Sequence, residues 1–180
     1  MPVLQQHYNS KVIPELKTKF GFKNVMAVPK VTKVVINVGY GRHVKENAYI
    51  ENVERTLTVI TGQKPVHTKA KKAISNFKTR VGLPIGISVT LRGRNMYEFL
   101  YKLVHITLPR VRDFRGLPPK AFDRRGSYSI GLKEHLAFPE IGSSGVDKIH
   151  GLQIVVVTTA KNREEGHALL KAMGFPFRDK

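Results

Sequence analysis

Apolar residues recur at helical spacing in four stretches of the chain. An i, i+3, i+4 spacing places these residues on one face of an α-helix. The pattern predicts helices over residues 2–20, 47–60, 96–108 and 162–173. Gly21, Gly62 and Gly174 follow three of these stretches and are natural helix stops, and Pro109 is expected to end the third helix. Pro14 predicts a bend in the first helix.

Between these helices lie segments with strand patterns. Residues 31–38 are rich in β-branched side chains, and residues 85–92 alternate between apolar and polar positions, as a half-buried strand does. Shorter segments of the same kind predict three more strands, over residues 65–69, 127–132 and 152–159. Residues 71–84 and 110–125 have little periodicity, so both are expected to be loops.

Helices and strands therefore alternate along the whole chain, in the order β-α-β-β-α-β-β-α behind an N-terminal helix. Neither a linker of low complexity nor an internal repeat divides the sequence. We expect an α+β fold in a single domain over residues 1–180, with basic loops projecting near 69–84 and 110–126. The order favours a largely antiparallel sheet with helices on one face. The other face is expected to be open for binding.

The charge of the chain indicates what that face binds. Lysine and arginine number 31 against 13 acidic residues, which gives a formal charge of +18. No acidic residue lies between Glu54 and Glu98, although that stretch contains nine cations. Lysine and arginine that neutralise phosphates release condensed counterions, so nucleic acid is the partner that such a surface favours. The nine cations are Arg55, Lys64, Lys69, Lys71, Lys72, Lys78, Arg80, Arg92 and Arg94.

Other function classes find little support. The chain has no cysteine, which excludes disulfides, cysteine-ligated metals and thiol catalysis. It lacks a phosphate-binding Gly-Lys-Ser/Thr motif, and its seven histidines include no i, i+4 pair, so we expect neither a cofactor nor a metal site. Without a signal sequence or an apolar run of about 20 residues, the chain is expected to be cytoplasmic and not membrane-bound.

An enzymatic alternative has to use the few carboxylates. A metal-dependent nuclease centre would need several of them to converge on a cation. The candidates are Asp113, Asp123, Glu134 and Glu140. The two aspartates lie among arginines that would pair with them, and no pattern nominates a nucleophile. The sequence therefore favours a non-enzymatic protein.

Three groups of residues are candidates for RNA contact. Asn37, Gln63 and Thr90 are polar residues at strands or strand edges; they either satisfy backbone groups or contact RNA hydroxyls and phosphates. The second group is the cations of the loop near 69–84, which surround Phe77: Lys69, Lys71, Lys72, Lys78 and Arg80. Phe77 either anchors the loop in the core or stacks on a base. Arg110, Arg112, Arg115, Arg124 and Arg125 form the third group, and guanidinium suits bidentate phosphate contact.

Several motifs together resemble a known family. They match, in order, the universal large-subunit ribosomal protein family five, of bacterial type, whose members bind 5S ribosomal RNA in the central protuberance. Two positions depart from the family pattern: Val81 replaces an acidic residue that many members carry, and Arg124 replaces a small one. The matching segments are residues 28–30, 35–41, 61–66, 68–72, 77–78, 84–86, 89–93, 96–100, 108–110, 112–117 and 138–141.

The resemblance implies a structural ribosomal protein with three contact surfaces. The expected 5S RNA surface consists of Asn37, Gln63, Lys64, Thr68, Thr90 and Arg92. A loop toward peptidyl-site transfer RNA would contain Lys69, Lys71, Lys72, Phe77, Lys78 and Arg80. The five arginines between 110 and 125 would meet large-subunit RNA or a small-subunit head protein. Other proteins of the central protuberance are further expected partners, and a free-standing RNA-binding or chaperone protein is the alternative.

Overall fold

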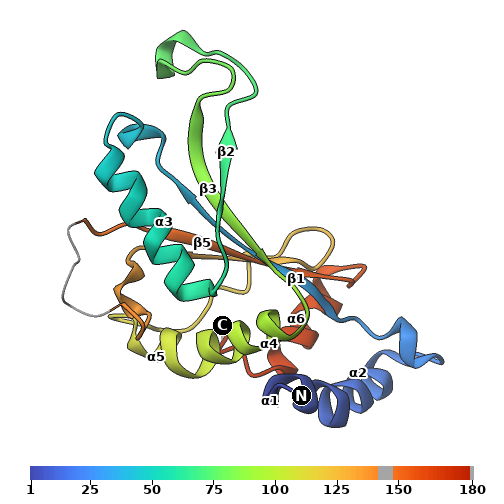
Figure 1. Cartoon of the computed structure of the whole chain (residues 1–180). Helices are drawn as coiled ribbons and strands as arrows, with labels where there is room; N and C mark the ends of the chain where they lie inside the picture. The colour runs from blue at the N-terminus through green and yellow to red at the C-terminus, as the bar shows by residue number, and fades with distance from the viewer. Residues whose placement is uncertain (142–147, 179–180) are drawn as a thin grey trace. The chain divides into compact units, whose positions relative to one another are not determined.

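The computed structural model describes residues 1–141 and 148–178, and it confirms the α+β class. One five-stranded sheet has the strand order β2-β3-β1-β5-β4. All five expected strands are present within one or two residues of their predicted bounds (Figure 1). They are β1 (Val31–Gly39), β2 (Val66–Lys69), β3 (Pro84–Leu91), β4 (Tyr128–Leu132) and β5 (Leu152–Thr158).

The sheet is antiparallel, as the alternation of elements predicted. Strands β2 and β3 pair in antiparallel register, with Thr68 opposite Gly86. The end of β1 meets the start of β3, because the Tyr40 amide donates to the Ile85 carbonyl at 3.0 Å. The start of β1 meets the end of β5, where the amide of Thr159 donates to the carbonyl of Lys30 at 2.9 Å.

The helices also follow the predicted stripes. Their bounds are α1 (Val3–His7), α2 (Ile13–Phe20), α3 (Asn47–Thr61), α4 (Gly93–Lys102), α5 (Leu108–Arg110) and α6 (Arg163–Ala172). Gly21 and Gly62 are the C-caps of α2 and α3 and adopt the left-handed conformation, with φ of 68° and 67°. Both were predicted to be helix stops. Asn162 caps α6 by accepting a hydrogen bond from the Glu165 amide.

Two prolines do not end their helices, which corrects one prediction. A π-helical turn over Tyr8–Val12 precedes Pro14, and a second over Leu103–Thr107 precedes Pro109. A proline ring removes one amide donor and clashes with the carbonyl four residues earlier. The wider π turn gives each ring room, so the helical path continues. The third predicted helix accordingly runs past Pro109 to Arg110, and it begins at Gly93 rather than at residue 96.

The described residues fall into two compact units. The terminal unit comprises Met1–Val34, Leu91–Ile130 and Ile154–Lys180, and the central unit comprises Val35–Thr90 and Gly131–Gln153. Three of the five strands, β1, β4 and β5, contribute two or more residues to each unit. The expectation of a single domain stays a prediction.

Each unit has its own buried side chains. In the terminal unit α1 packs against α4 and α2 contacts α6, and their leucines are fully buried, as in Leu16 and Leu100. In the central unit α3 buries Val53, Leu57 and Ile60, the stripe that the sequence predicted. Burying such side chains stabilises the fold by about 1.5–3 kcal/mol each. No helix of the described chain is long and apolar enough to cross a membrane.

Candidate nucleic-acid interface

The exposed face of the central unit's strands carries polar and small residues. In β1 the side chains of Ile36 and Val38 are buried, and Asn37 between them is half-buried. Because side chains alternate along a strand, Asn37 points to the opposite face. Strand β3 repeats the arrangement, with Val89 and Leu91 buried and Thr90 exposed.

Thr68 of β2 lies on the same open face. Its partner across the ladder is Gly86, and a Cβ built on Gly86 would lie 2.8 Å from the Thr68 hydroxyl oxygen and 3.2 Å from the Val38 carbonyl. Glycine is therefore needed at position 86 for the threonine to rest against the sheet. The structure brings Asn37, Thr68 and Thr90 onto one open face of the central unit.

The other predicted members of the 5S surface are not on that strand face. Gln63 and Lys64 lie in the connection between α3 and β2, where the amide of Gln63 donates to the Thr61 hydroxyl at 3.3 Å. Gln63 is half-buried and Lys64 is exposed. Arg92 follows β3, belongs to the terminal unit and occupies the N-cap position of α4 with an extended backbone. The strand-edge placement predicted for Gln63 is therefore wrong, because Gln63 lies in the bend after Gly62, the C-cap of α3, and β2 begins only at Val66.

The loop between β2 and β3 is an ordered extension of the hairpin, at the top of Figure 1. At its base the Ala70 amide donates to the Leu83 carbonyl at 2.8 Å, and at its tip Ile74 and Thr79 form an isolated antiparallel bridge. Lys78 adopts a left-handed backbone with φ of 52°. The loop is therefore joined by its own backbone hydrogen bonds and not by packing against the core.

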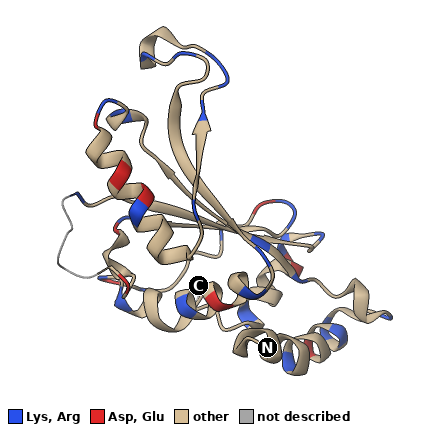
Figure 2. Cartoon of the chain, in the orientation of Figure 1, with Lys and Arg blue, Asp and Glu red and all other residues tan. Residues whose placement is uncertain are grey.

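The side chains of this loop are open to solvent. Phe77 is 73% exposed, so core anchoring, one of the two interpretations of this residue, is wrong. The five predicted cations of the loop are exposed, and none forms an ion pair with a residue of the described chain. Figure 2 shows basic residues and no acidic residue along the loop. The cations are Lys69, Lys71, Lys72, Lys78 and Arg80.

The arginine-rich segment of the terminal unit is anchored by its apolar residues. Leu117 and Phe122 are buried, and the Leu117 amide donates to the Pro176 carbonyl at 2.7 Å. Arg110 ends α5, and the other four arginines follow it: Arg112, Arg115, Arg124 and Arg125. All five are exposed. The sequence did not identify this anchoring, because two apolar residues among many charges give no periodicity.

The two aspartates of this segment do not pair with the arginines in the described structure. The Asp123 carboxylate instead accepts hydrogen bonds from the backbone amides of Arg125 and Ser127, at 2.9 and 2.7 Å. The guanidinium groups are consequently available to an external anion. No group of three or more metal-ligating side chains occurs among residues 1–141 and 148–178, so the carboxylates considered for a nuclease centre do not assemble there.

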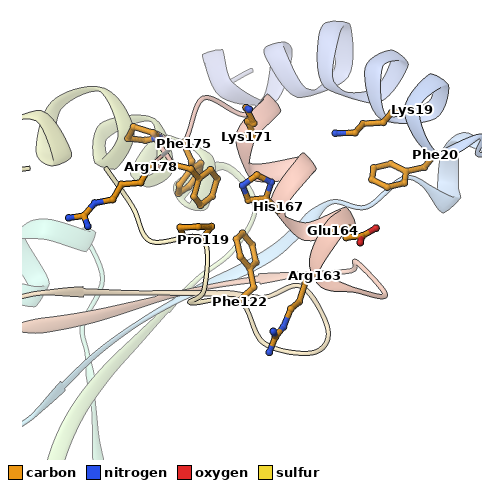
Figure 3. Close-up of a pocket in the computed structure, with 12 residues that line it drawn as sticks. Lys19, Phe20, Pro119, Phe122, Arg163, Glu164, His167, Lys171, Phe175 and Arg178 are labelled. Carbon is orange, nitrogen blue, oxygen red and sulfur yellow. The ribbon is translucent and has the colours of Figure 1, made fainter. Parts of the chain in front are cut away.

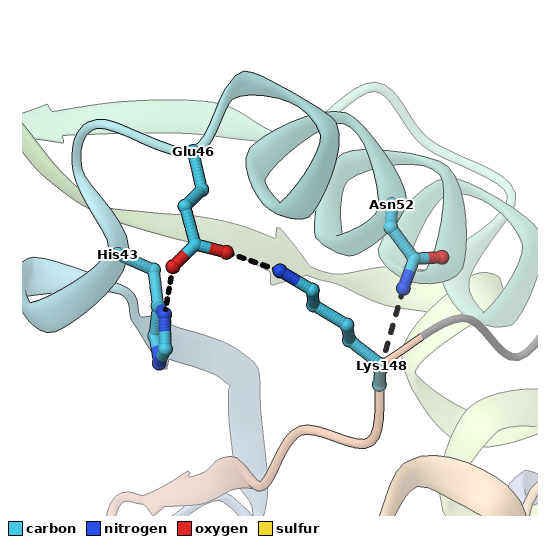
Figure 4. Close-up of polar contacts among 4 residues, drawn as sticks. All are labelled: His43, Glu46, Asn52 and Lys148. Carbon is cyan, nitrogen blue, oxygen red and sulfur yellow. Dashed lines mark hydrogen bonds and ion pairs between the residues drawn. The ribbon is translucent and has the colours of Figure 1, made fainter.

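A polar network secures the start of α3 in the central unit (Figure 4). Glu46 accepts hydrogen bonds from Nδ1 of His43, at 2.9 Å, and from the ammonium group of Lys148. These bonds, with His43 contributing most, lower the pKa of Glu46 to about 2. Asn52 adds a bond from its amide to the Lys148 carbonyl at 3.3 Å. Glu46, one of the few acidic residues, is therefore already paired within the protein. The sequence could not predict this network, because Lys148 lies about 100 positions from Glu46 and Asn52.

Two buried histidines form a second feature of the central unit. The rings of His135 and His150 stack with centroids 4.1 Å apart and planes 13° apart. The side chains are 1% and 4% exposed. Burial, followed by the charge of His135, lowers the pKa of His150 to about 4, and burial also lowers the pKa of His135. Both imidazoles are therefore neutral at neutral pH, and the pair belongs to the core.

The geometry defines a class of protein: a basic α+β protein with an open polar sheet face and exposed cationic loops, without assembled catalytic groups in its described residues. Comparisons with known proteins specify the family. Residues 24–80 match the model of ribosomal protein L5, and residues 84–177 match the separate model of the C-terminus of the same ribosomal family.

Proteins from several bacteria are similar over almost the full length. The large ribosomal subunit protein uL5 of Halothermothrix orenii is 55% identical over 177 residues, which cover 98% of this chain and 99% of that protein. The uL5 protein of Polynucleobacter asymbioticus is 57% identical over 175 residues, covering 97% of each chain. The chain belongs to the ribosomal protein L5 family of the large subunit. It is thus a structural ribosomal protein and not an enzyme.

Proposed function

We propose that this protein binds 5S ribosomal RNA through the open sheet face of its central unit and helps attach that RNA in the central protuberance. The observation that carries the proposal is that the half-buried Asn37 and the exposed Thr68 and Thr90 lie together on an open sheet face. Amide and hydroxyl groups suit the 2′-hydroxyls and phosphates of a wide, shallow RNA groove. Gln63 and Lys64, in the connection before β2, add contacts at its margin. Arg92, which follows β3 in the chain, is a further proposed contact to 5S RNA.

The hairpin loop is proposed to contact peptidyl-site transfer RNA. Its five cations lack ion-pair partners in the described chain, so they retain their full attraction for phosphate. Phe77, at 73% exposure, offers a ring on which an unpaired base can stack. The loop extends beyond the polar strand face, which suits contact with a second RNA molecule.

The exposed arginines between 110 and 125 are proposed to form the third surface, which contacts large-subunit RNA and a head protein of the small subunit. The Asp123 carboxylate accepts hydrogen bonds from backbone amides and forms no ion pair with these arginines within the described chain. Guanidinium groups form bidentate hydrogen bonds with the phosphates of RNA and with the carboxylates of a protein, so the same arginines suit both partners. Neighbouring proteins of the central protuberance are further proposed partners.

The sheet-face proposal is tested by substituting two of its residues. We expect Asn37→Ala combined with Thr90→Ala to weaken binding of 5S RNA by about 1–3 kcal/mol, because a polar contact to RNA is lost at each position. Both side chains are at least partly exposed, so the fold should survive. The measurement is a filter-binding titration at fixed salt, with circular dichroism to verify folding.

A matched control uses the same two residue types elsewhere. Asn9 and Thr18 are exposed residues of the N-terminal helical segment in the terminal unit. Replacing both with alanine should leave the affinity for 5S RNA unchanged. If the Asn37 and Thr90 variant binds as tightly as the control, the 5S RNA surface lies elsewhere.

A further inference from the structure

The terminal unit contains a cavity that none of the three proposed surfaces uses. Its volume is about 700 Å³, which is large enough for one nucleotide. Four segments line it: the end of α2, the arginine-rich segment, α6 and the C-terminal stretch (Figure 3). No residue of the open sheet face borders this cavity.

Aromatic rings form one wall of the cavity. His167 lies 4.6 Å from Phe177 and 5.7 Å from Phe122, measured between ring centroids. Phe122 is 4% exposed and is supported from behind by Tyr128, at 4.4 Å. His167 and Phe177 are half-buried, so parts of their rings remain available. These ring contacts fix the wall, and its exposed ring surface can stack against a planar group.

Cations surround the cavity. Lys19, Arg163, Lys171 and Arg178 line it, and Glu164 is the one carboxylate among the described lining residues. None of the four cations forms an ion pair within the part of the chain that the structure describes. Burial, then Lys171 and Lys19, lower the pKa of His167, so the positive potential reaches the aromatic wall. An anionic ligand would relieve this repulsion.

We propose that the cavity binds one unstacked nucleotide of single-stranded RNA, with its base against His167 and Phe177 and its phosphate near Lys19 and Lys171. The proposal rests on the RNA-binding function proposed above, but it concerns a different surface. Every nucleotide joins a flat ring to a phosphate, which matches the aromatic wall and the cations together. An acidic peptide would need an aromatic and an acidic side chain in the right order.

The test is a nuclear magnetic resonance titration of the full-length protein with an adenosine tetranucleotide. We expect the amide signals of Phe122, His167 and Phe177 to shift and the pKa of the His167 imidazole to rise on binding. Phe177→Leu keeps an apolar side chain but removes stacking, so it should weaken binding by about fivefold or more. Substituting Lys19 and Lys171 with alanine should also weaken it, whereas alanine at Lys11 and Lys17, exposed cations outside the cavity, should not.

Ligands that carry only part of a nucleotide show whether the cavity recognises the base as well as the phosphate. Ribose 5-phosphate and inorganic phosphate lack the base and should bind much more weakly than the tetranucleotide. Equal shifts with either of them, absence of shifts, or tighter binding of a peptide containing phenylalanine and glutamate would overturn the proposal. The Asn37 and Thr90 variant should still bind the tetranucleotide, and the cavity variants should still bind 5S RNA. Failure of one proposal is therefore distinguishable from failure of the other.

Discussion

At the scale of single residues, the buried histidine pair has a consequence for stability. A histidine with a folded-state pKa below its usual value binds fewer protons in the folded state than in the unfolded state. The pKa of His150 is lowered from 6.5 to about 4. Its contribution to stability is therefore complete above pH 6.5 and is lost as the pH falls from 6.5 toward 4.

We predict that His150→Phe flattens this acid dependence. Phenylalanine can stack on His135 but does not titrate, so the loss of stability between pH 6.5 and 4 should shrink by up to about 3 kcal/mol. The measurement is the free energy of unfolding in urea at several pH values. His105→Phe, at an exposed site, is the control and should keep the dependence of the original protein. Identical pH profiles for all three proteins would show that the pair does not couple folding to protons.

At the scale of elements, the contact of α6 with the turn before β4 depends on two glycines. A Cβ on Gly166 would lie 2.3 Å from the Gly126 carbonyl oxygen, and a Cβ on Gly126 would lie 2.6 Å from the Asn162 carbonyl. Both obstacles are backbone atoms, which move less readily than side chains. Gly126 also has a φ of 71°, a conformation that favours glycine.

Gly166→Ala is therefore predicted to destabilise the protein, although alanine usually stabilises a helix relative to glycine by up to about 1 kcal/mol. Overpacking should outweigh that gain and cost about 1–3 kcal/mol or more. Gly131→Ala in β4 is the control, since its Cβ would meet no atom within 4 Å. Thermal denaturation of the two variants measures the difference, and an unchanged melting temperature for Gly166→Ala would refute the close approach.

The hairpin loop gives a second prediction at this scale. Replacing Lys71, Lys72, Lys78 and Arg80 with alanine should weaken retention of transfer RNA in the peptidyl site but leave 5S RNA binding and subunit assembly largely intact. The four side chains are exposed and contribute no core packing. The measurement is the dissociation rate of transfer RNA from purified mutant ribosomes. An unchanged rate together with lost 5S RNA binding would assign the loop to a different partner.

Much of the fold follows from local patterns in the sequence. The stripe of α3 and the alternation of β3 were predicted because burial on one face imposes a period of 3.6 or 2 residues. Strand β1 was predicted from its run of β-branched residues. The course of the chain through Pro109 was missed, since a π turn leaves no mark in the hydrophobic pattern. Asn37 and Thr90 could be placed on an open sheet face from their strand positions, whereas Gln63 was placed there wrongly and Thr68 was named only through the family resemblance.

The remaining features depend on residues distant in sequence. The stacking of His135 on His150, the network around Glu46 and the aromatic cavity each join segments that have no shared pattern. Phe77 was ambiguous because exposure of a loop residue depends on whether the tip folds back, and local spacing does not determine that. Tertiary structure was needed in each of these cases.

At the scale of the whole molecule, the proposed RNA binding depends on the charge of +18 and on its distribution. If cations around the open face hold 5S RNA through phosphate contacts, the affinity must fall steeply with salt, because each contact releases counterions. Lys64 is exposed and unpaired within the described chain, so it is a suitable residue for isolating one such contact.

The most direct measurement is the affinity of the intact protein for 5S RNA as a function of salt concentration. We predict that a plot of log K against log salt has a slope steeper than about −3, corresponding to several phosphate contacts. Lys64→Ala should lower the affinity and flatten the slope by about one unit or less. A slope near zero for the unmodified protein would contradict the claim that its basic surface binds RNA.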